Sequence, residues 1–438
     1  MDPFAYVEDW HQRLSKGGWW HSFELPDGTL IEGVNALSAQ KARIAQFAIP
    51  ADLRGKRALD IGAWDGWFTF ELERRGAEVV SIDRWDNPRF REMHAALGSR
   101  ADYRQINVYD LDPRKLGQFD VVLFLGVLYH LKHPLLALER VCAVARDFAA
   151  IESFALTDRF QPGMNVEEHS LLRFFERDEF GGQFDNWFAP TPRCLIEMCR
   201  TAGFARAELS AVHDFGAAVN CFRRWPENTP ETPAPHLFTA IHAENFGINF
   251  GSDCDDYVQA EASGGAPWTL ANMQGEVSGL GSAPIAVSET AEGHHRANFK
   301  LPPGLSAGWH EVRVRTADSE WSRPVRIAVD LPASADAIEI ATSCEAFDWR
   351  PGRFSLSHRF FSLWLRGLAD AENADRGNVK VEIEGRRQRT DFVSLPDANG
   401  LRQVNVLAAE STRPGKLQVV AEFGGVRSAP VEIEATLP

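Results

Sequence analysis

The sequence predicts an α/β domain with a parallel sheet and helices on both of its faces, followed by two all-β sandwiches. From residue 57 to Trp225, short apolar runs alternate with helix-like segments, a pattern typical of parallel sheets. A proline-rich stretch, "PENTPETPAP", begins at Pro226 and has the composition of a linker. Beyond it, runs such as "HEVRVRT" and "VKVEIEG" alternate with a period of two, which indicates half-buried strands.

The strand-rich half also repeats itself. Residues 307–332 align with residues 413–438, which places Pro324 on Pro430 and Leu331-Pro332 on Leu437-Pro438. A period of about 100 residues is the size of an immunoglobulin-like sandwich, so we expect two of them in tandem. The predicted divisions are an N-terminal cap segment at 1–50, the α/β domain at 51–225, a linker at 226–236, and sandwiches at 237–332 and 338–438.

Composition and charge exclude several classes of protein. No apolar run approaches the roughly 20 residues of a membrane span, and we expect no secretory signal because the N-terminal residues are acidic. The six cysteines form no CxxC pair, so we expect reduced thiols in a cytoplasmic protein. A net charge of -15 lacks the basic surface that nucleic-acid binding needs, so we expect neither a nucleic-acid nor a membrane partner.

The stretch "ALDIGAWDGWFTFEL" at 58–72 follows the first predicted strand with two glycines, Gly62 and Gly66. Glycine permits a tight turn and the close approach of a ligand to the backbone. Ligands of open parallel sheets bind at the carboxyl ends of the strands. Asp60 at this turn would repel a phosphate and suit a cationic amino acid. The glycine spacing also differs from the GxGxxG pattern of dinucleotide-binding proteins.

Polar groups end the next apolar runs as well. Asp83 ends "VVSIDRW", where a carboxylate can accept hydrogen bonds from both ribose hydroxyls. In "QINVYDLD", we expect Asn107 to bond the edge of an adenine and Val108 to pack on its face. The run "FDVVLFLGVLYHLKHP" ends in Gly126, Tyr129 and His130. Together these groups predict a pocket for a nucleoside with an amino-acid tail, which is S-adenosylmethionine.

With these motifs, residues 40–225 resemble class I S-adenosylmethionine-dependent methyltransferases, whose domain has a Rossmann-like sheet. Within that superfamily, "GVLYHLKHPLLAL", "IES" and "NWFAPTPRCLIEMCRTAGF" are similar to the tRNA wobble-uridine 5-oxyacetate methyl and carboxymethyl transferases. The resemblance implies that Tyr129 faces the transferable group. It also implies cofactor contacts at Asp60, Gly62, Gly66, Asp83, Asn107 and Val108. We expect further contacts at the neighbouring residues Ala63, Trp64, Arg84 and Gly126.

The chain departs from the carboxymethyl transferases of this family at one position. Those proteins hold the extra carboxylate with an upstream lysine, a tyrosine in the GVLYH segment and a late arginine. Lys16 and Tyr129 are the counterparts here, but Ala217 and Ala218 stand roughly where the arginine is expected. A carboxylate would be poorly neutralised without that cation, so we expect plain methyl transfer.

Transfer to a hydroxyl would be helped by a general base. His130 stands at the tip of the fourth strand and is the first candidate, Glu152 at the end of the fifth strand is the second, and Tyr129 completes the predicted catalytic set. His169 is the third candidate base and lies on an insert that we expect to cover the substrate. A histidine at a strand tip can also serve only as an orienting hydrogen-bond donor. No cluster has metal-ligand spacing, so we expect no metal site.

These features predict an S-adenosylmethionine-dependent enzyme that O-methylates a small molecule or a glycan, with sandwiches that recruit the substrate or form a homodimer. Two alternatives stay open. One is methyl or carboxymethyl transfer to the wobble uridine of tRNA, and the other is a non-catalytic interaction or carbohydrate-binding protein on a methyltransferase scaffold. The intact set of Asp60, Gly62, Gly66 and Asp83 favours an enzyme, because a decayed site should lose a cofactor contact before it loses its fold.

Overall fold

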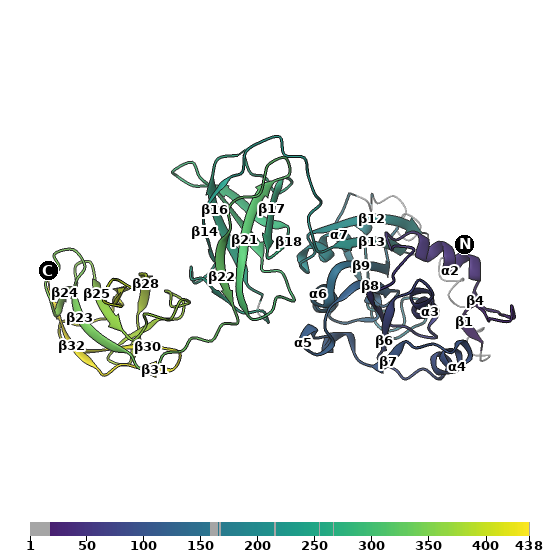
Figure 1. Ribbon diagram of the computed structural model, residues 1–438, viewed down its shortest axis with the longest axis horizontal. Coiled ribbons are helices and arrows are strands. Elements are labelled where there is room, and N and C mark those ends of the chain that lie inside the picture. Colours follow the sequence, from purple (N-terminus) through teal and green to yellow (C-terminus); the bar gives the residue numbers. More distant parts are fainter. Residues whose placement is uncertain are drawn as a thin grey trace. The chain divides into compact units, whose positions relative to one another are not determined.

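The structure is a computed structural model that describes residues 18–157, 165, 168–213, 216–253, 255–265 and 267–437 (Figure 1). The chain divides into two compact units. The first contains the residues up to Asn228 together with Gln274–Ala283 and Pro302–Gly304, and the second contains the remainder. Among the described residues, none of the helices combines the length and apolar composition that a bilayer crossing requires.

The first unit is built on a seven-stranded sheet with the order β12-β13-β9-β8-β5-β6-β7. Its strands are β5 (Arg57–Ile61), β6 (Glu78–Asp83), β7 (Asp102–Gln105), β8 (Phe119–Leu125), β9 (Ala145–Phe154), β12 (Arg206–His213) and β13 (Gly216–Phe222). The pairs β5–β6, β5–β8, β6–β7 and β8–β9 are parallel, as the alternating apolar runs predict. This arrangement supports the Rossmann-like class expected from the sequence.

One strand of this sheet runs against the others, which the apolar runs did not indicate. β13 is antiparallel to both β9 and β12. Its register pairs His213 with Gly216, so the link between β12 and β13 is far shorter than the dozen or more residues that a parallel crossover needs. The short link therefore forces β13 to reverse.

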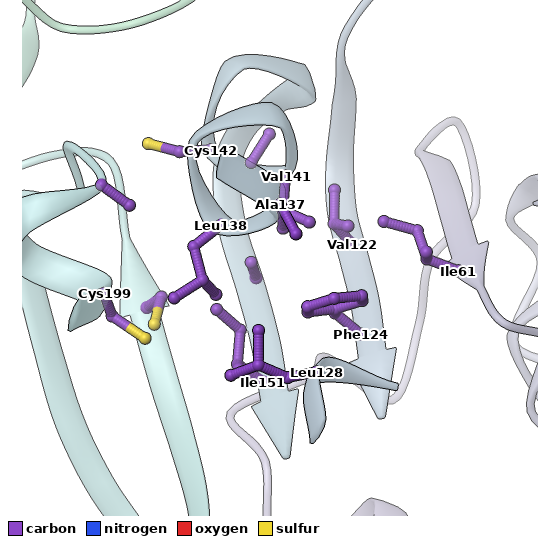
Figure 2. Packing of buried hydrophobic residues seen from close by; sticks show 14 of the residues in the cluster. Ile61, Val122, Phe124, Leu128, Ala137, Leu138, Val141, Cys142, Ile151 and Cys199 are labelled. Carbon is purple, nitrogen blue, oxygen red and sulfur yellow. The ribbon is translucent and has the colours of Figure 1, made fainter. Parts of the chain in front are cut away.

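Helices cover both faces of the sheet because successive side chains of each strand point to opposite sides. Leu59 and Ile61 of β5 belong to one buried cluster, and Ala58 belongs to another. Figure 2 shows the first cluster, where Val122 and Phe124 of β8 lie close to the apolar face of α6. The helices are α2 (Leu37–Ala45), α3 (Trp67–Arg74), α4 (Pro88–Leu97), α5 (Pro113–Leu116), α6 (Pro134–Val144) and α7 (Pro192–Thr201), with short 3-10 turns at η1 (Val108–Asp110) and η2 (Leu128–His130).

The helices begin where the sequence supplies caps. The Thr191 side chain accepts a hydrogen bond from the Cys194 N–H at the start of α7, and Pro192 occupies the first turn. Asn87 caps α4 in the same way, and Gly98 ends that helix in the left-handed conformation. Such caps satisfy N–H and carbonyl groups that have no partner inside the helix.

Short strands precede and interrupt the main sheet of the first unit. Ahead of α2, β1 (Trp19–His21) pairs in parallel with β4 (Gly33–Asn35), and β2 (Phe23–Glu24) pairs with β3 (Leu30–Ile31). Between β9 and α7, β10 (Leu172–Phe174) pairs with β11 (Phe188–Pro190). The hairpin of β17 (Met273–Val277) and β18 (Leu280–Ser282) is also grouped largely with this unit.

The second unit contains the predicted repeat. The strand order β14-β16-β20-β19 recurs as β23-β25-β29-β28, and β15-β22-β21 recurs as β24-β32-β30, which continues to β26 and β27. In both copies a short strand pairs in parallel with its neighbour: β15 with β22, and β24 with β32. The aligned segments 307–332 and 413–438 therefore form equivalent hairpins, in which Gly308 pairs with Val329 and Gly415 with Ala435.

The strands of the first copy are β14 (His236–His242), β15 (Asn249–Phe250), β16 (Tyr257–Ser263), β19 (Pro284–Glu289), β20 (His295–Lys300), β21 (Gly308–Thr316) and β22 (Val325–Val329). Those of the second are β23 (Glu339–Glu345), β24 (Arg353–Ser355), β25 (Phe360–Arg366), β26 (Lys380–Ile383), β27 (Arg386–Arg387), β28 (Arg389–Val393), β29 (Arg402–Leu407), β30 (Gly415–Phe423), β31 (Val426–Arg427) and β32 (Val431–Thr436). Phe361 of β25 and Val419 of β30 lie in one buried cluster, so the two sheets of this copy share a core.

We predict that Gly62→Ala destabilises the first unit. Gly62 has a φ of +76°, and an added Cβ would lie 2.3 Å from Val127 Cγ2. The left-handed backbone and the clash should together lower stability by about 2–5 kcal/mol. Scanning calorimetry should show a lower midpoint for the thermal transition of this unit. Adding Val127→Ala should recover only part of the loss, since it removes the clash and leaves the backbone strain. A full recovery, or no initial loss, would contradict this account.

Candidate functional site

Four strand ends meet at one edge of the sheet and bring the predicted polar groups together. Asp60 lies near the end of β5, Asp83 ends β6, Gly126 follows β8, and Glu152 lies near the end of β9. The register confirms that these ends are level, because Ile61 pairs with Ile82 and Leu125 with Glu152. Parallel strands place such groups at the same edge, where ligands of open α/β sheets bind.

The loop between β5 and α3 is held by backbone hydrogen bonds to β6 and within the loop. The N–H groups of Gly62 and Ala63 both donate to the Ile82 carbonyl, and the Gly66 N–H donates to the Ala63 carbonyl. A Cβ at Gly66 would lie 2.7 Å from the Phe70 ring, so packing requires both glycines. Trp64 has a φ of +53°, uncommon for a residue with a side chain, and its indole is 45% exposed.

Asp83 ties this loop to the end of β6. Its Oδ2 accepts from the Trp64 N–H at 3.0 Å and its Oδ1 from the Trp85 N–H at 3.1 Å. A carboxylate oxygen has further lone pairs, so both oxygens can still accept from a ligand. Next along this edge, the Arg84 guanidinium lies 4.7 Å from the Trp85 ring centre.

Asn107 and Val108 lie where η1 begins. The Asn107 side-chain oxygen accepts from the Tyr109 N–H at 3.1 Å, which leaves the amide N–H groups to point elsewhere. Val108 is only 6% exposed and belongs to the buried cluster that contains Leu59 and Ile61. Ala63 is also buried, in the cluster on the other face of the sheet, which contains Ala58. The structure thus places all the predicted cofactor residues at this edge, and their contact with a cofactor stays a prediction.

Asp60 is almost completely buried. Its Oδ2 accepts from the Thr69 hydroxyl at 2.7 Å, and that hydroxyl also lies 2.7 Å from the Ser81 hydroxyl. Burial raises the pKa of Asp60 to about 6, and the nearby Asp83 carboxylate acts in the same direction. Asp60 therefore carries its negative charge at neutral pH at a cost, which a cationic partner would offset.

Arg43 of α2 is the central cation of this edge, and the sequence analysis missed it. Its Nε donates to Glu152 Oε2 at 2.7 Å, and its guanidinium lies 5.1 Å from the Phe68 ring centre. A Cβ at Gly126 would lie 3.3 Å from an Arg43 nitrogen and 3.9 Å from the Tyr129 hydroxyl. One sequence signal could have identified Arg43, because Gln40 and Ile44 mark the buried face of α2 beside it.

The three predicted catalytic residues have different surroundings. The Glu152 carboxylate is paired with the Arg43 guanidinium. Burial raises the pKa of Tyr129 to about 12, so its phenol stays protonated and acts as a donor. His130 is 32% exposed at its side chain, and its Nδ1 lies 3.3 Å from the Asp185 carbonyl and 3.6 Å from the Asp185 carboxylate. A hydrogen bond from His130 lowers the pKa of Asp185, so that carboxylate is ionised beside the ring.

Other predicted residues lie farther from this group. His169 is exposed, and its carbonyl accepts from the Thr191 hydroxyl at the start of α7. Ala217 and Ala218 are completely buried on β13, where Ala218 pairs with Glu152. No cation therefore stands at that position of β13. Lys16 lies outside the described residues.

A second pair that the sequence analysis missed links the N-terminal strands to the loop. The Asp65 carboxylate accepts from the N–H groups of Trp20 and His21, both at 2.9 Å, and from His21 Nδ1. Asp65 is 1% exposed and His21 4% exposed. The two residues lie 44 positions apart, and no local sequence pattern connects them.

The donor set of this edge fits S-adenosylmethionine. Asp83 has free acceptor capacity for the two hydroxyls of a ribose. Asp60 offers a buried negative charge for an ammonium, and Arg43 offers a positive charge for a carboxylate. Among the described residues, no group of three or more His, Cys, Asp or Glu side chains is arranged to hold a metal ion.

Comparison with known proteins identifies the same domain. Residues 35–205 match the family model of a methyltransferase domain. The chain is 43% identical over 86 residues to the ubiquinone biosynthesis O-methyltransferase of Nitrosococcus oceani, an alignment that covers 19% of this chain and 36% of that protein. It is 32% identical over 165 residues to the protein of the same name from Neisseria meningitidis serogroup C, which covers 36% of this chain and 67% of that protein.

A third relative belongs to a different functional group. The chain is 30% identical over 166 residues to the tRNA U34 carboxymethyltransferase of Pseudomonas aeruginosa, which covers 36% of this chain and 47% of that protein. The chain thus spans 36% of the length of the Nitrosococcus relative and about half of the Pseudomonas one. The strand-rich half lies outside the residues matched to the family model.

We predict that Asp60→Asn removes a pH-dependent loss of stability. Because the folded-state pKa of Asp60 is raised from 3.8 to about 6, the folded protein holds this proton more tightly than the unfolded chain does. Stability should therefore fall by about 3 kcal/mol as the pH rises from 4 to above 6. The thermal midpoint of Asp60→Asn should exceed that of the wild type above pH 6 and approach it near pH 4. Asp86→Asn, at an exposed position, should show no such difference; a constant offset for Asp60→Asn would contradict the prediction.

Proposed function

The chain belongs to the S-adenosylmethionine-dependent methyltransferases, and we propose that it transfers the methyl group of that cofactor to a hydroxyl oxygen of a small molecule or glycan. The observation that carries the proposal is the edge where Asp60, Asp83 and the Arg43–Glu152 pair converge. This edge combines the groups that a nucleoside with a zwitterionic tail requires.

Each part of the cofactor has a residue of matching chemistry. Asp83 would accept from the ribose hydroxyls, while Asn107 and Val108 would contact the adenine. Arg43 would hold the carboxylate, and Asp60 would face the ammonium through the buried charge described above. When bound, S-adenosylmethionine supplies a methyl group on a positively charged sulfur, which leaves as a neutral thioether.

The acceptor oxygen has to lose its proton as the new bond between oxygen and carbon forms. His130 would accept this proton as the general base, because Glu152 is paired with Arg43 and Tyr129 keeps its own proton. Asp185, ionised beside Nδ1, would stabilise the imidazolium that results. The role of the surrounding residues is to align the acceptor with the methyl carbon and to exclude water.

The same edge favours the plain cofactor over its carboxylated form. Ala218 pairs with Glu152 on the strand where the carboxymethyl transferases would place an arginine, and Ala217 beside it is also apolar. A second carboxylate would therefore have to share Arg43, which already pairs with Glu152. Carboxymethyl or methyl transfer to a tRNA wobble uridine is the second candidate, favoured by the similarity to the Pseudomonas protein.

The strand-rich half has no part in this chemistry, and we propose that it consists of two immunoglobulin-like sandwiches that recruit the acceptor or form a homodimer. The repeated strand order supports a duplicated module. A non-catalytic interaction or carbohydrate-binding protein on a methyltransferase scaffold is the alternative if no cofactor binds. The cytoplasmic location expected from the free cysteines belongs to the same proposal.

We predict that calorimetric titration of the full chain detects micromolar binding of S-adenosylmethionine and at least tenfold weaker binding of its carboxylated analogue. Asp83→Ala should weaken cofactor binding about 100-fold or more, because it removes two hydrogen bonds to a charged group. Asp86→Ala, which changes an exposed carboxylate three residues away, is the control and should bind like the wild type. Preference for the analogue would transfer the proposal to the tRNA reaction, and binding of neither would support the non-catalytic alternative.

We also predict that His130→Ala lowers kcat about 100-fold or more, the usual contribution of a general base, and changes the cofactor Kd by less than about threefold. Release of S-adenosylhomocysteine would be followed with phenolic, catecholic and sugar hydroxyl acceptors. His169→Ala, at the exposed histidine, is the matched control and should keep its turnover. A fully active His130→Ala variant would exclude this residue as the base.

A further inference from the structure

His21 is a buried histidine with one nitrogen committed and one unused. Its Nδ1 bonds Asp65, whereas its Nε2 is buried and has no hydrogen-bond partner among the described residues. Buried polar atoms in folded proteins nearly always have a partner, and an unpaired one costs free energy. An Nε2 atom held in this state therefore points to a ligand that completes its hydrogen bonding.

Asp65 fixes the direction in which Nε2 points. Its carboxylate accepts from the Trp20 N–H, the His21 N–H and the His21 ring, so the ring is clamped through both its backbone and its side chain. The ring also packs edge-on against Phe68, with centroids 5.3 Å apart and planes at 88°. A ring with so many fixed contacts is held in one orientation before any ligand binds.

The position of the pair relates it to the amino-acid end of the cofactor. Phe68 contacts His21 on one side and the Arg43 guanidinium, at 5.1 Å, on another. Arg43 in turn reaches Glu152 and the position of Gly126. Asp83, the proposed ribose site, bonds the Trp64 N–H in the same loop, so the ligand would extend from there toward Arg43.

We infer that His21 is a cofactor-binding residue whose Nε2 hydrogen-bonds the amino-acid end of S-adenosylmethionine, with Asp65 as its positioning residue. That end carries an ammonium that donates and a carboxylate that accepts, so it satisfies Nε2 in either protonation form of the ring. The inference rests on the proposed function, because it assumes that this cofactor binds at the edge described above.

The test compares two ligands that differ in this end. S-Adenosylhomocysteine carries the amino-acid tail, and 5′-methylthioadenosine lacks it. His21→Asn is the informative variant, since its amide can replace Nδ1 in the bond to Asp65 but supplies nothing at Nε2. Calorimetry on the full chain gives the selectivity, defined as the Kd of methylthioadenosine divided by the Kd of S-adenosylhomocysteine.

We predict that His21→Asn lowers this selectivity by about tenfold or more, the effect of one hydrogen bond to a charged group, and leaves methylthioadenosine binding within about threefold. His21→Gln, whose longer amide reaches the position of Nε2, should keep a larger part of the selectivity than His21→Asn does. It is also the test if His21→Asn does not fold. His236→Asn, at an exposed histidine of the second unit, should match the wild type.

The outcomes separate this inference from the proposed function. Wild-type selectivity in both His21 variants, or an equal loss for both ligands, would overturn the role of His21 while leaving the methyltransferase proposal intact. A wild-type chain that binds neither ligand would overturn both.

Discussion

The first unit depends on one electrostatic constraint: three carboxylates converge at one edge of its sheet, and Arg43 offsets part of their charge from another element. Parallel strands bring Asp60, Asp83 and Glu152 to the same edge whatever their charges. Burial makes the charge of Asp60 costly, as its raised pKa shows. Arg43 reaches in from α2 and neutralises Glu152 directly. Both α2, through Arg43, and β1, through the His21–Asp65 contact, thus reach residues of this edge or of the loop beside it.

A second consequence is that the β5–α3 loop is shaped before a ligand arrives. The N–H groups of Gly62, Ala63 and Gly66 bond carbonyls within the protein, and that of Trp64 bonds Asp83. The glycine pattern in the sequence predicts a loop whose backbone a ligand approaches closely. The structure shows that packing against Val127 and Phe70 already requires the glycines. The recognition chemistry of this edge therefore comes mainly from side chains.

The parallel sheet, the helices on both of its faces and the repeat in the second unit were predictable because each follows from local periodicity. Alternating apolar residues locate strands, and parallel strands must share an edge, so Asp60, Asp83 and Asn107 could be predicted to converge. The partners of Arg43 and of His21 could not be predicted, because they lie 109 and 44 positions away in the sequence. The reversal of β13 follows from its short link to β12, and apolar periodicity gives no information about the length of a link. Its position at a strand end predicts Glu152 as a candidate base, whereas its ion pair with Arg43 alters the chemistry that it can perform.

The same charge balance bears on the choice between the two cofactor forms. With its carboxylates ionised, the edge formed by Asp60, Asp83, Glu152 and Arg43 carries a net negative charge. S-Adenosylmethionine brings a sulfonium, an ammonium and a carboxylate, so its net charge is positive and is attracted to this edge. The carboxylated form has a second carboxylate and no net charge, so it loses that attraction. An arginine on β13 at Ala217 or Ala218 would change the balance, and it would do so directly beside Glu152. Under the proposed function, the charge balance at these two small residues of β13 favours the plain cofactor.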